Sequence, residues 1–227
     1  MINREYTEYY WRLHNDWSIP QPHIDYLKTI NYTPTVVYDI GAAVLHWTKE
    51  AKKIWPEAKY YNFEAVLETE DFFKEYGAEY ALGVFSDTDG RELIFHNHPL
   101  YLGGNSYYRE NDQYSPAAKD IYNEAARERR ITSTIDTVVR EKGFELPDFV
   151  KIDVQGAELD ILNGMTYTLQ NVKHLIVELQ HVEYNVGAKQ VQESIPFIQS
   201  LGFELVPNPQ TYFCGNGPDA DYHFIRK

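Results

Sequence analysis

Two acidic residues stand at the ends of two short runs of β-branched and aromatic side chains. The run at 36–40 holds Asp39 just before Gly41, and the run at 60–64 ends at Glu64. Gly41 lacks a Cβ, so the backbone of this turn can come close to a ligand. An acid at the end of the second strand of an open α/β sheet can accept both hydroxyls of a ribose. The pair predicts a site for a nucleotide-like ligand; the alternative is that Asp39 caps the turn and Glu64 is merely exposed.

The first turn lacks the residues that hold phosphate. A dinucleotide site needs G-x-G-x-x-G, so that a pyrophosphate can sit on the helix N-terminus. Residues 41–46 read G-A-A-V-L-H instead, without two of the three glycines, and the lysine of a phosphate-binding loop is absent too. A ligand with a ribose but without phosphates therefore fits better, and S-adenosylmethionine is the common one.

A second acidic motif, K-I-D-V-Q-G-A-E over residues 151–158, closes the fourth expected parallel strand. The first and fourth strands flank the point at which the strand order of such a sheet reverses, so we expect Asp153 to face the reactive end of a cofactor. An acid there can orient a hydroxyl, bind a metal or act as a base. The alternative for Asp153 and Lys151 is a buried ion pair, and Glu158 in the first helical turn suits the helix dipole.

Further candidate site residues lie at the end of the next expected strand and in a loop between earlier strands. Glu178 lies at the end of the run 174–179, and His181 comes just after it. Because this strand is expected beside the one that ends at Asp153, the three side chains could converge, and such a set could also hold Mg²⁺ or Mn²⁺. We expect Asp153 and Glu178 as the metal ligands, a hypothesis that activity after thorough chelation would overturn. Ser106, in a glycine-rich loop, could touch the cofactor or the substrate, whereas His181 could equally be an exposed loop residue.

The elements that must position these residues alternate between strands and helices. We expect a doubly wound α/β sheet of about seven strands with the last one antiparallel. The strands are predicted at 36–40, 59–64, 81–85, 92–96, 148–154, 174–179, 203–206 and 222–225, and the helices at 47–55, 68–76, 116–130, 134–142, 157–163 and 191–201. The D-T-D-G sequence at 87–90 predicts a β-hairpin between the third run and the next. Residues 97–115 are expected to form a long functional loop.

Length and composition favour one soluble domain. The 227 residues predict a single catalytic core over 34–227, preceded by an amphipathic helical extension over 1–33 that Pro20 and Pro22 interrupt. The net charge of −13 makes nucleic acid a poor partner, and we interpret the arginines at 127–130 as a solvated helix face because glutamates interleave with them. The sequence has one cysteine, no apolar run near the ~20 residues of a membrane span and no signal peptide. We therefore expect a cytoplasmic protein, which could also be one domain of a larger chain.

Three sequence blocks carry a family resemblance. V-Y-D-I-G-A at 37–42, F-E-A at 63–65 and above all K-I-D-V-Q-G-A-E-L-D-I-L-N-G at 151–164 resemble the FkbM-like family of S-adenosylmethionine-dependent methyltransferases. The resemblance runs from about 35 to 180. It implies a Rossmann-like class I methyltransferase fold and O-methylation, often of sugars or polyketide-type hydroxyls.

The resemblance also implies roles for single residues. Asp39 and Gly41 would shape the methionine end of the cofactor site, Glu64 would hold the ribose hydroxyls, Leu82 would lie near the adenine, and Asp153 would lie at the methyl-transfer centre. The first loop departs from the family pattern, which more often has asparagine at position 43 and glycine at position 45, where this chain has alanine and leucine.

The expected activity is methyl transfer from S-adenosylmethionine to a hydroxyl of a sugar, glycan or similar small molecule. A hydroxyl is a weak nucleophile that needs a base or a metal, and the candidate bases are Asp153, His181 and Glu178. The alternatives are a non-catalytic Rossmann-like binding module and an NAD-dependent oxidoreductase, against which the missing glycines argue.

Overall fold

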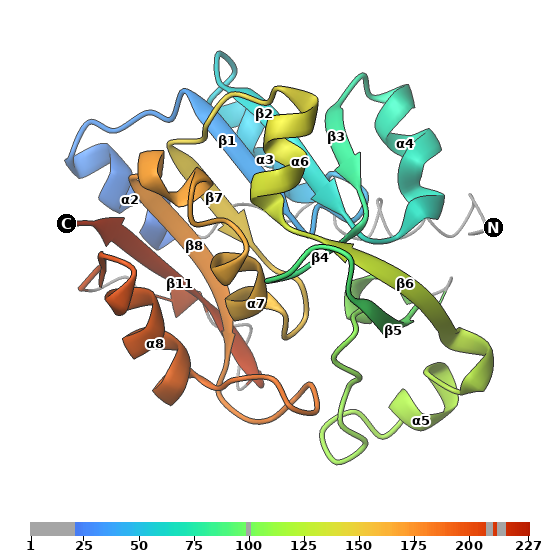
Figure 1. Ribbon diagram of the computed structural model, residues 1–227. Coiled ribbons are helices and arrows are strands. Elements are labelled where there is room, and N and C mark those ends of the chain that lie inside the picture. Colours follow the sequence, from blue (N-terminus) through green and yellow to red (C-terminus); the bar gives the residue numbers. More distant parts are fainter. Residues whose placement is uncertain (1–20, 99–100, 208–210, 213–216) are drawn as a thin grey trace.

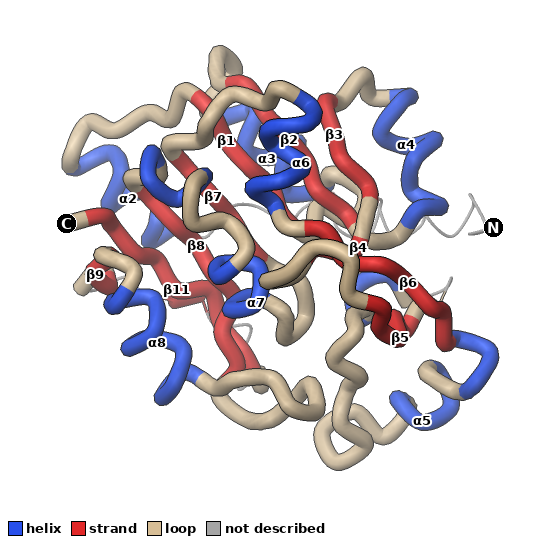
Figure 2. Tube along the Cα trace, in the orientation of Figure 1, coloured by secondary structure: helices blue, strands red, loops and turns tan. Residues whose placement is uncertain are grey.

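Eight strands form the central sheet in the part of the chain that the computed structural model describes, residues 21–98, 101–207, 211–212 and 217–227. The order along the sheet is β3-β2-β1-β7-β8-β11-β10, with β9 paired to β11 (Figures 1 and 2). The bounds are β1 Val36–Ile40, β2 Lys59–Glu64, β3 Glu79–Leu82, β7 Phe149–Ile152, β8 His174–Gln180, β9 Phe203–Leu205, β10 Thr211–Tyr212 and β11 Asp219–Arg226. Because β11 runs antiparallel to β8 while the pairs from β3 to β8 are parallel, the predicted doubly wound sheet with an antiparallel end is confirmed.

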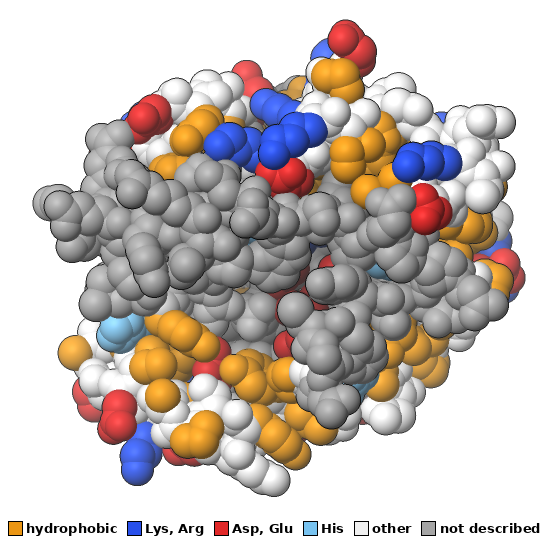
Figure 3. All heavy atoms as spheres, turned by 180° about the vertical axis from the view of Figure 1, so that it is seen from behind, with side chains coloured by type: hydrophobic (Ala, Val, Ile, Leu, Met, Phe, Trp, Pro, Cys, Tyr) orange, Lys and Arg blue, Asp and Glu red, His pale blue; other side chains and the backbone are white. Residues whose placement is uncertain are grey.

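Helices cover both faces of this sheet, so the side chains of its central strands are buried on both faces. All residues of β1 and β7 are buried, and alternate side chains of β1 enter different cores. Tyr38 and Ile40 pack against α6, α7 and α8, whereas Val37 packs against α2 and α3. These helices span α2 Gln21–Thr29, α3 His46–Ile54, α6 Ile135–Lys142, α7 Glu158–Asn163 and α8 Val191–Ser200, and α4 Glu70–Glu75 lies beside β3 (Figure 1). The face that α2 and α3 cover mixes acidic, basic and apolar side chains (Figure 3).

The strand order reverses between β1 and β7, as the sequence predicts. The register places Ile40 beside Ile152 of β7 and beside Phe63 of β2. The residues that follow these positions, Gly41, Asp153 and Glu64, therefore meet at one edge of the sheet. This is the edge at which open α/β sheets bind ligands.

A second sheet of three strands, β4 (Val84–Phe85), β5 (Glu92–His96) and β6 (Arg127–Ser133), overturns two expectations. The hairpin predicted around 87–90 does not form between neighbouring runs, because β4 and β5 each pair with β6, which comes some thirty residues later. The expected strand 81–85 is also divided at Gly83, where the chain leaves β3 of the central sheet and enters β4 of the second sheet.

The helix predicted over 116–130 is wrong beyond its first part. The structure has the short helices α5 (Ala118–Ile121) and η3 (Glu124–Ala126), and then β6. The arginines of β6 lie on a strand instead of a helix face. Arg129 pairs across the ladder with Glu92 at 2.5 Å, whereas Arg127 and Arg130 pair with the nearby Glu124 and Glu128. A charge-rich strand at a sheet surface and a charge-rich helix look alike in sequence, because both expose most of their side chains.

The N-terminal extension is helical in its described part. α2 begins at Gln21, with Pro22 in its first turn, where the missing N–H of proline costs no helical hydrogen bond. Ile24 and Leu27 of α2 pack on the sheet against Val37, Phe149 and neighbouring residues. The rest of the predicted extension, residues 1–20, lies outside the described residues. Within the described part of the chain, no helix has the length and apolarity that crossing a membrane requires.

Three histidines are buried where α2 meets β8 and β11. His174 Nδ1 lies 3.1 Å from His223 Nε2, and the ring of His23 stands edge-on to that of His223, with centroids 5.2 Å apart. Both nitrogens of His23 lack a hydrogen-bond partner within the described residues. Burial lowers the pKa of His23 to about 4. Burial also lowers the pKa of His174 to about 4, although the charge of Asp148 raises it in part. The pKa of His223 is lowered by burial as well.

We expect this histidine cluster to make the protein lose stability as the pH falls from about 6.5 towards 4. Between these pH values the histidines of the unfolded chain take up protons that the buried rings of the folded protein do not. Each ring therefore contributes up to about 1.4 kcal/mol per pH unit to the slope of the free energy of unfolding against pH. Urea unfolding at a series of pH values measures the slope. His23→Phe, which keeps a ring in place, should reduce the slope, while His98→Phe outside the cluster should leave it unchanged; equal slopes for His23→Phe and the wild type would contradict the assignment.

Candidate active site

A cavity of about 850 Å³, its open mouth included, lies at the edge of the sheet where β1, β2 and β7 end. The wall is apolar where β4 and β5 face the cavity and polar where the strand ends converge, and the loop after β5 contributes both apolar and polar side chains. The lining residues are Gly41, Ala43, His46, Phe63, Glu64, Ala65, Val84, Phe85, Phe95, Leu102, Gly103, Asn105, Ser106, Tyr107, Asp153, Val154, Gln155, Ala157, Ile161 and Glu178.

The turn after β1 lies directly against the end of β7. Gly41 has a φ of +83°, and a Cβ there would lie 1.7 Å from the carbonyl oxygen of Asp153. The absence of this Cβ thus allows two strand ends to touch. The turn continues through Ala43 and Leu45 with φ of +46° and +66°, a region that side chains with a Cβ rarely adopt. Asparagine or glycine at these two positions would therefore relieve strain.

Glu64 is buried at the end of β2 and faces the cavity, so the alternative of a merely exposed glutamate is wrong. Its carboxylate accepts hydrogen bonds from the backbone N–H of Ala43 at 2.6 Å, Ala65 at 2.8 Å and Val66 at 2.9 Å. Burial raises the pKa of Glu64, although these three bonds lower it in part. The side chain thus fixes the turn after β1 and the turn after β2 to each other.

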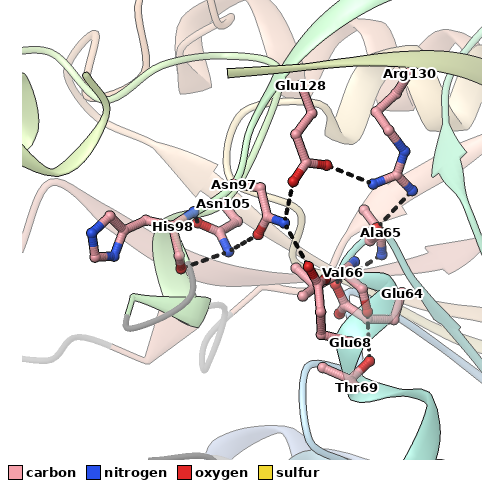
Figure 4. Close-up of polar contacts among 10 residues, drawn as sticks. All are labelled: Glu64, Ala65, Val66, Glu68, Thr69, Asn97, His98, Asn105, Glu128 and Arg130. Carbon is pink, nitrogen blue, oxygen red and sulfur yellow. Dashed lines mark hydrogen bonds and ion pairs between the residues drawn. The ribbon is translucent and has the colours of Figure 1, made fainter. Parts of the chain in front are cut away.

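A polar network joins the turn after β2 to the loop that walls the cavity (Figure 4). Arg130 of β6 donates to the carbonyl of Ala65 at 3.1 Å and to Glu128 at 3.2 Å. Glu128 in turn accepts from Asn97 at 2.9 Å, and Asn97 accepts from the amide of Asn105 at 3.0 Å. The second sheet therefore positions the loop after β5, which the sequence predicts as a functional segment.

Asp39 and Lys151 form a buried ion pair behind the cavity. They stand beside each other on β1 and β7, with Lys151 Nζ 3.5 Å from Asp39 Oδ1 and 3.3 Å from Asp153 Oδ2. Thr48 donates to the other oxygen of Asp39 at 2.7 Å. Burial raises the pKa of Asp39 more than the charge of Lys151 lowers it, and the nearby acids raise the pKa of Lys151 above its ordinary value although burial lowers it.

Asp153 and Glu178 meet at the polar end of the cavity and are bridged by an amide. Gln155 Nε2 donates to Asp153 Oδ1 and to Glu178 Oε2, both at 2.9 Å. Burial raises the pKa of Asp153, but the charge of Lys151 and hydrogen bonds from Glu178 and Gln155 outweigh it and hold that pKa below its usual range. Burial and the charge of Asp153 hold the pKa of Glu178 well above its usual range. The pKa values of these two acids are therefore shifted in opposite directions.

Residues 38–205 match the sequence model of the methyltransferase FkbM domain, which covers most of the chain. The chain belongs to the FkbM methyltransferase family. The resemblance inferred from the sequence blocks is thereby confirmed, and with it a fold and family of S-adenosylmethionine-dependent methyltransferases.

Known proteins resemble this FkbM methyltransferase over shorter stretches or at low identity. The hexuronic acid methyltransferase AglP of Haloferax volcanii is 46% identical over 44 residues, which are 19% of this chain and only 18% of the length of that enzyme. The magnesium protoporphyrin IX methyltransferase of Synechocystis, solved with bound S-adenosylmethionine, has a TM-score of 0.49 at 10% identity over 90% of this chain and 76% of that one. TrmK of M. capricolum, solved with S-adenosylhomocysteine, has a TM-score of 0.47 at 10% identity over 85% of this chain and 62% of that one.

The structure brings together some of the predicted site residues of this FkbM methyltransferase and separates others. Gly41, Glu64, Asp153, Glu178 and Ser106 all line the cavity. Their assigned roles in binding and catalysis stay predictions.

Three predicted site residues lie outside the cavity lining. Asp39 is fully buried in its ion pair, and Leu82 packs into the hydrophobic cluster beside β4. His181 lies beyond the end of β8, where its Nε2 is 3.0 Å from the hydroxyl oxygen of Tyr222. Leu82 is expected near the adenine, but Val84 and Phe85 of β4 line the cavity instead. The reason is that the chain turns away from the central sheet at Gly83.

The predicted metal site is not supported. Among the described residues, no group of three or more His, Cys, Asp and Glu side chains is placed to hold a metal ion. The amide of Gln155 lies between Asp153 and Glu178, where a shared cation would need to sit.

Among the residues of the cavity wall that sequence reasoning missed, His46 and Gln155 carry polar side chains. His46 is the first residue of α3, directly after the turn that starts at Gly41, and Gln155 has a φ of +57° in the turn after β7. Both stand in motifs that the sequence singles out. Their side-chain directions depend on left-handed backbone positions, which the residue types at these positions do not indicate.

Proposed function

We propose that this chain is an S-adenosylmethionine-dependent O-methyltransferase whose acceptor is a hydroxyl of a sugar, glycan or similarly hydroxylated small molecule, with residues 34–227 as its catalytic domain. One observation carries the proposal. The ends of three neighbouring strands present Gly41, Glu64 and Asp153 to a single cavity. This arrangement, in a chain of the FkbM family, supports a ribose site and a transfer site in one pocket.

The residues of the cavity fit S-adenosylmethionine. Phe63, Val84, Phe85 and Phe95 form an apolar wall suited to a purine ring, and Glu64 stands at the strand end that can accept ribose hydroxyls. The described lining contains no lysine or arginine, so it offers no cationic side chain to a pyrophosphate. The site therefore favours a nucleoside with a sulfonium over a dinucleotide.

When bound, S-adenosylmethionine supplies a methyl group that its sulfonium already activates. The task of the protein is then alignment of the acceptor oxygen with the methyl carbon and exclusion of water. Gly41 and Asp153 fix the two strand ends around the reactive end of the cavity. Asp153 supplies a negative charge there that Lys151 keeps ionised.

The wall near the acceptor side is suited to a hydroxylated ring. The aromatic ring of Tyr107 lines the cavity, and its hydroxyl is fixed by donation to Asp160 at 2.9 Å. A fixed aromatic face can pack against the apolar face of a sugar. The local similarity to a hexuronic acid methyltransferase supports a carbohydrate acceptor.

Calorimetric titration with S-adenosylmethionine and S-adenosylhomocysteine, before and after treatment with a chelator, tests the proposal first. We expect micromolar binding of both, and mass spectrometry should then show a gain of one methyl group on a sugar or glycan acceptor. A folded protein that binds neither ligand would contradict the proposal and favour a non-catalytic module.

Glu64→Gln should weaken the binding of S-adenosylmethionine by about 1–3 kcal/mol, because it removes the charge from a buried acceptor of hydroxyl hydrogen bonds. The matched control is Glu68→Gln, an exposed acid of the same turn that does not line the cavity. Calorimetry measures both dissociation constants. An unchanged constant for Glu64→Gln in a folded protein would refute the ribose role.

A further inference from the structure

One arginine of the second sheet is largely buried, although its neighbour in sequence is exposed. The side chain of Arg129 is 75% exposed and pairs with Glu92, whereas the side chain of Arg130 is 13% exposed. Successive side chains of a strand point to opposite faces, so Glu128 and Arg130 share one face of β6 and Arg129 lies on the other. Glu128 stands opposite Phe95, which lines the cavity. Arg130 therefore lies on the face of β6 that is turned towards the proposed cofactor site.

The guanidinium of Arg130 contacts two residues of the cavity wall. Its Cζ lies 5.6 Å from the centre of the Phe95 ring, and its Nη2 donates to the carbonyl oxygen of Ala65 at 3.1 Å. Its Nη1 donates to Glu128 at 3.2 Å, and Glu128 accepts in turn from Asn97 at 2.9 Å (Figure 4). Because a guanidinium is planar, bonds at two of its nitrogens fix its direction. Arg130 is thus held towards the turn after β2.

The peptide group between Ala65 and Val66 joins Arg130 to Glu64. Its carbonyl oxygen accepts from Arg130, and its N–H donates to Glu64 Oε1 at 2.9 Å. Hydrogen bonds in a chain polarise one another, and a bond from a cation is among the strong ones. The bond from Arg130 therefore fixes this peptide group and strengthens its hold on the Glu64 carboxylate.

The stability of the fold does not by itself account for an arginine at this position. Removing a guanidinium from water costs free energy that an ion pair repays only with good geometry. The ion-pair partner Glu128 is 39% exposed, and a pair so open to solvent contributes little. An apolar side chain at position 130 would pack against Phe95 without this cost. A carboxylate that must stay charged and directed at a ligand does account for the arginine.

We propose, on the basis of the proposed S-adenosylmethionine site, that Arg130 is a positioning residue that orients the Glu64 carboxylate for the ribose hydroxyls through the peptide group between Ala65 and Val66. Arg130 is not among the described residues that line the cavity, so it acts on the ligand through Glu64. Removal of Arg130 and removal of the Glu64 charge should therefore weaken the same interaction.

Calorimetric titration with S-adenosylhomocysteine measures this role. Arg130→Met keeps an apolar stem against Phe95 and removes the donors, and we expect it to weaken binding about tenfold, the range of one hydrogen bond to a charged group. The matched control is Arg129→Met, which removes the same charge from the exposed face of the same strand and should bind within about twofold of the wild type.

A double-variant cycle distinguishes positioning of Glu64 from a general effect on the fold. In the Glu64→Gln background, Arg130→Met should weaken binding by less than about twofold, because residues that act as one unit give non-additive losses. Arg130→Lys covers the case in which Arg130→Met does not fold. Lysine keeps the charge but lacks the planar fork that reaches Ala65 and Glu128 together, so we expect a loss of about threefold.

The outcomes separate this role from the function on which it rests. Wild-type affinity in both Arg130→Met and Arg130→Lys would overturn the role and leave the methyltransferase proposal standing. Equal losses for Arg130→Met in the wild-type and Glu64→Gln backgrounds would also overturn it, because Arg130 would then act independently of Glu64. A folded wild-type protein that binds neither S-adenosylmethionine nor S-adenosylhomocysteine would overturn both proposals.

Discussion

Lys151→Met is expected to lower the free energy of unfolding by about 3–5 kcal/mol. Lys151 is 5% exposed at its side chain and Asp39 is fully buried, so the substitution leaves a carboxylate inside the core without its cation. Methionine keeps the length and the apolar stem of the lysine, so the loss reports the charge and not a cavity. Urea unfolding at constant pH measures it.

The double variant Asp39→Asn/Lys151→Met separates the ion pair from other causes. It removes both charges while keeping the hydrogen bond from Thr48, so most of the lost stability should return. Lys53→Met on the surface of α3 serves as a control for loss of a lysine charge. A double variant as unstable as the single one would show that Lys151 acts through some other contact.

Asp153→Asn is expected to lower kcat at least 100-fold while the fold survives. Asparagine keeps the size of the side chain and removes the charge that faces the reactive end of the cavity. Lys151 retains Asp39 as a partner, so we expect the free energy of unfolding to change by less than about 2 kcal/mol. Steady-state kinetics and urea unfolding on the same preparation measure both effects.

Glu178→Gln is the informative companion to that variant. Burial and the charge of Asp153 hold the pKa of Glu178 well above its usual range, so a neutral amide is a closer substitute for Glu178 than for Asp153, whose pKa is lowered. We therefore expect kcat within about tenfold of the wild type, the range of a lost hydrogen bond without a lost charge. If Glu178→Gln proved as inactive as Asp153→Asn, or if Asp153→Asn retained near-normal turnover, the assignment of the charge to Asp153 would be wrong.

Local patterns predicted the parts of the fold that local physics decides. A buried parallel strand between two helical layers is mainly apolar, and runs such as 36–40 and 174–179 have that character. Helices such as α6 begin and end where the residue types indicate, with Thr134 accepting from the N–H of Thr137 and Gly143 in the left-handed conformation.

Such local patterns do not predict the second sheet. β5 finds its partner in β6, some thirty residues further on, across a loop and two short helices. A turn such as 87–90 predicts pairing of its own neighbours, and only the packed structure decides between that pairing and a distant one. The helix predicted for the arginines of β6 is wrong for a related reason, since charge alone does not distinguish a solvated strand from a solvated helix.

The sequence by itself determined that acids would stand at the ends of β1, β2 and β7, because strand ends and family motifs are local properties. Only the tertiary structure decided which of these acids face the cavity. Asp39 and Lys151 share a register position on neighbouring strands, so they pair inside the core, while Asp153, one residue past the end of its strand, is free to face the site. His46 reaches the same site through the left-handed turn at Ala43 and Leu45, a backbone path set by contact between two strands far apart in sequence.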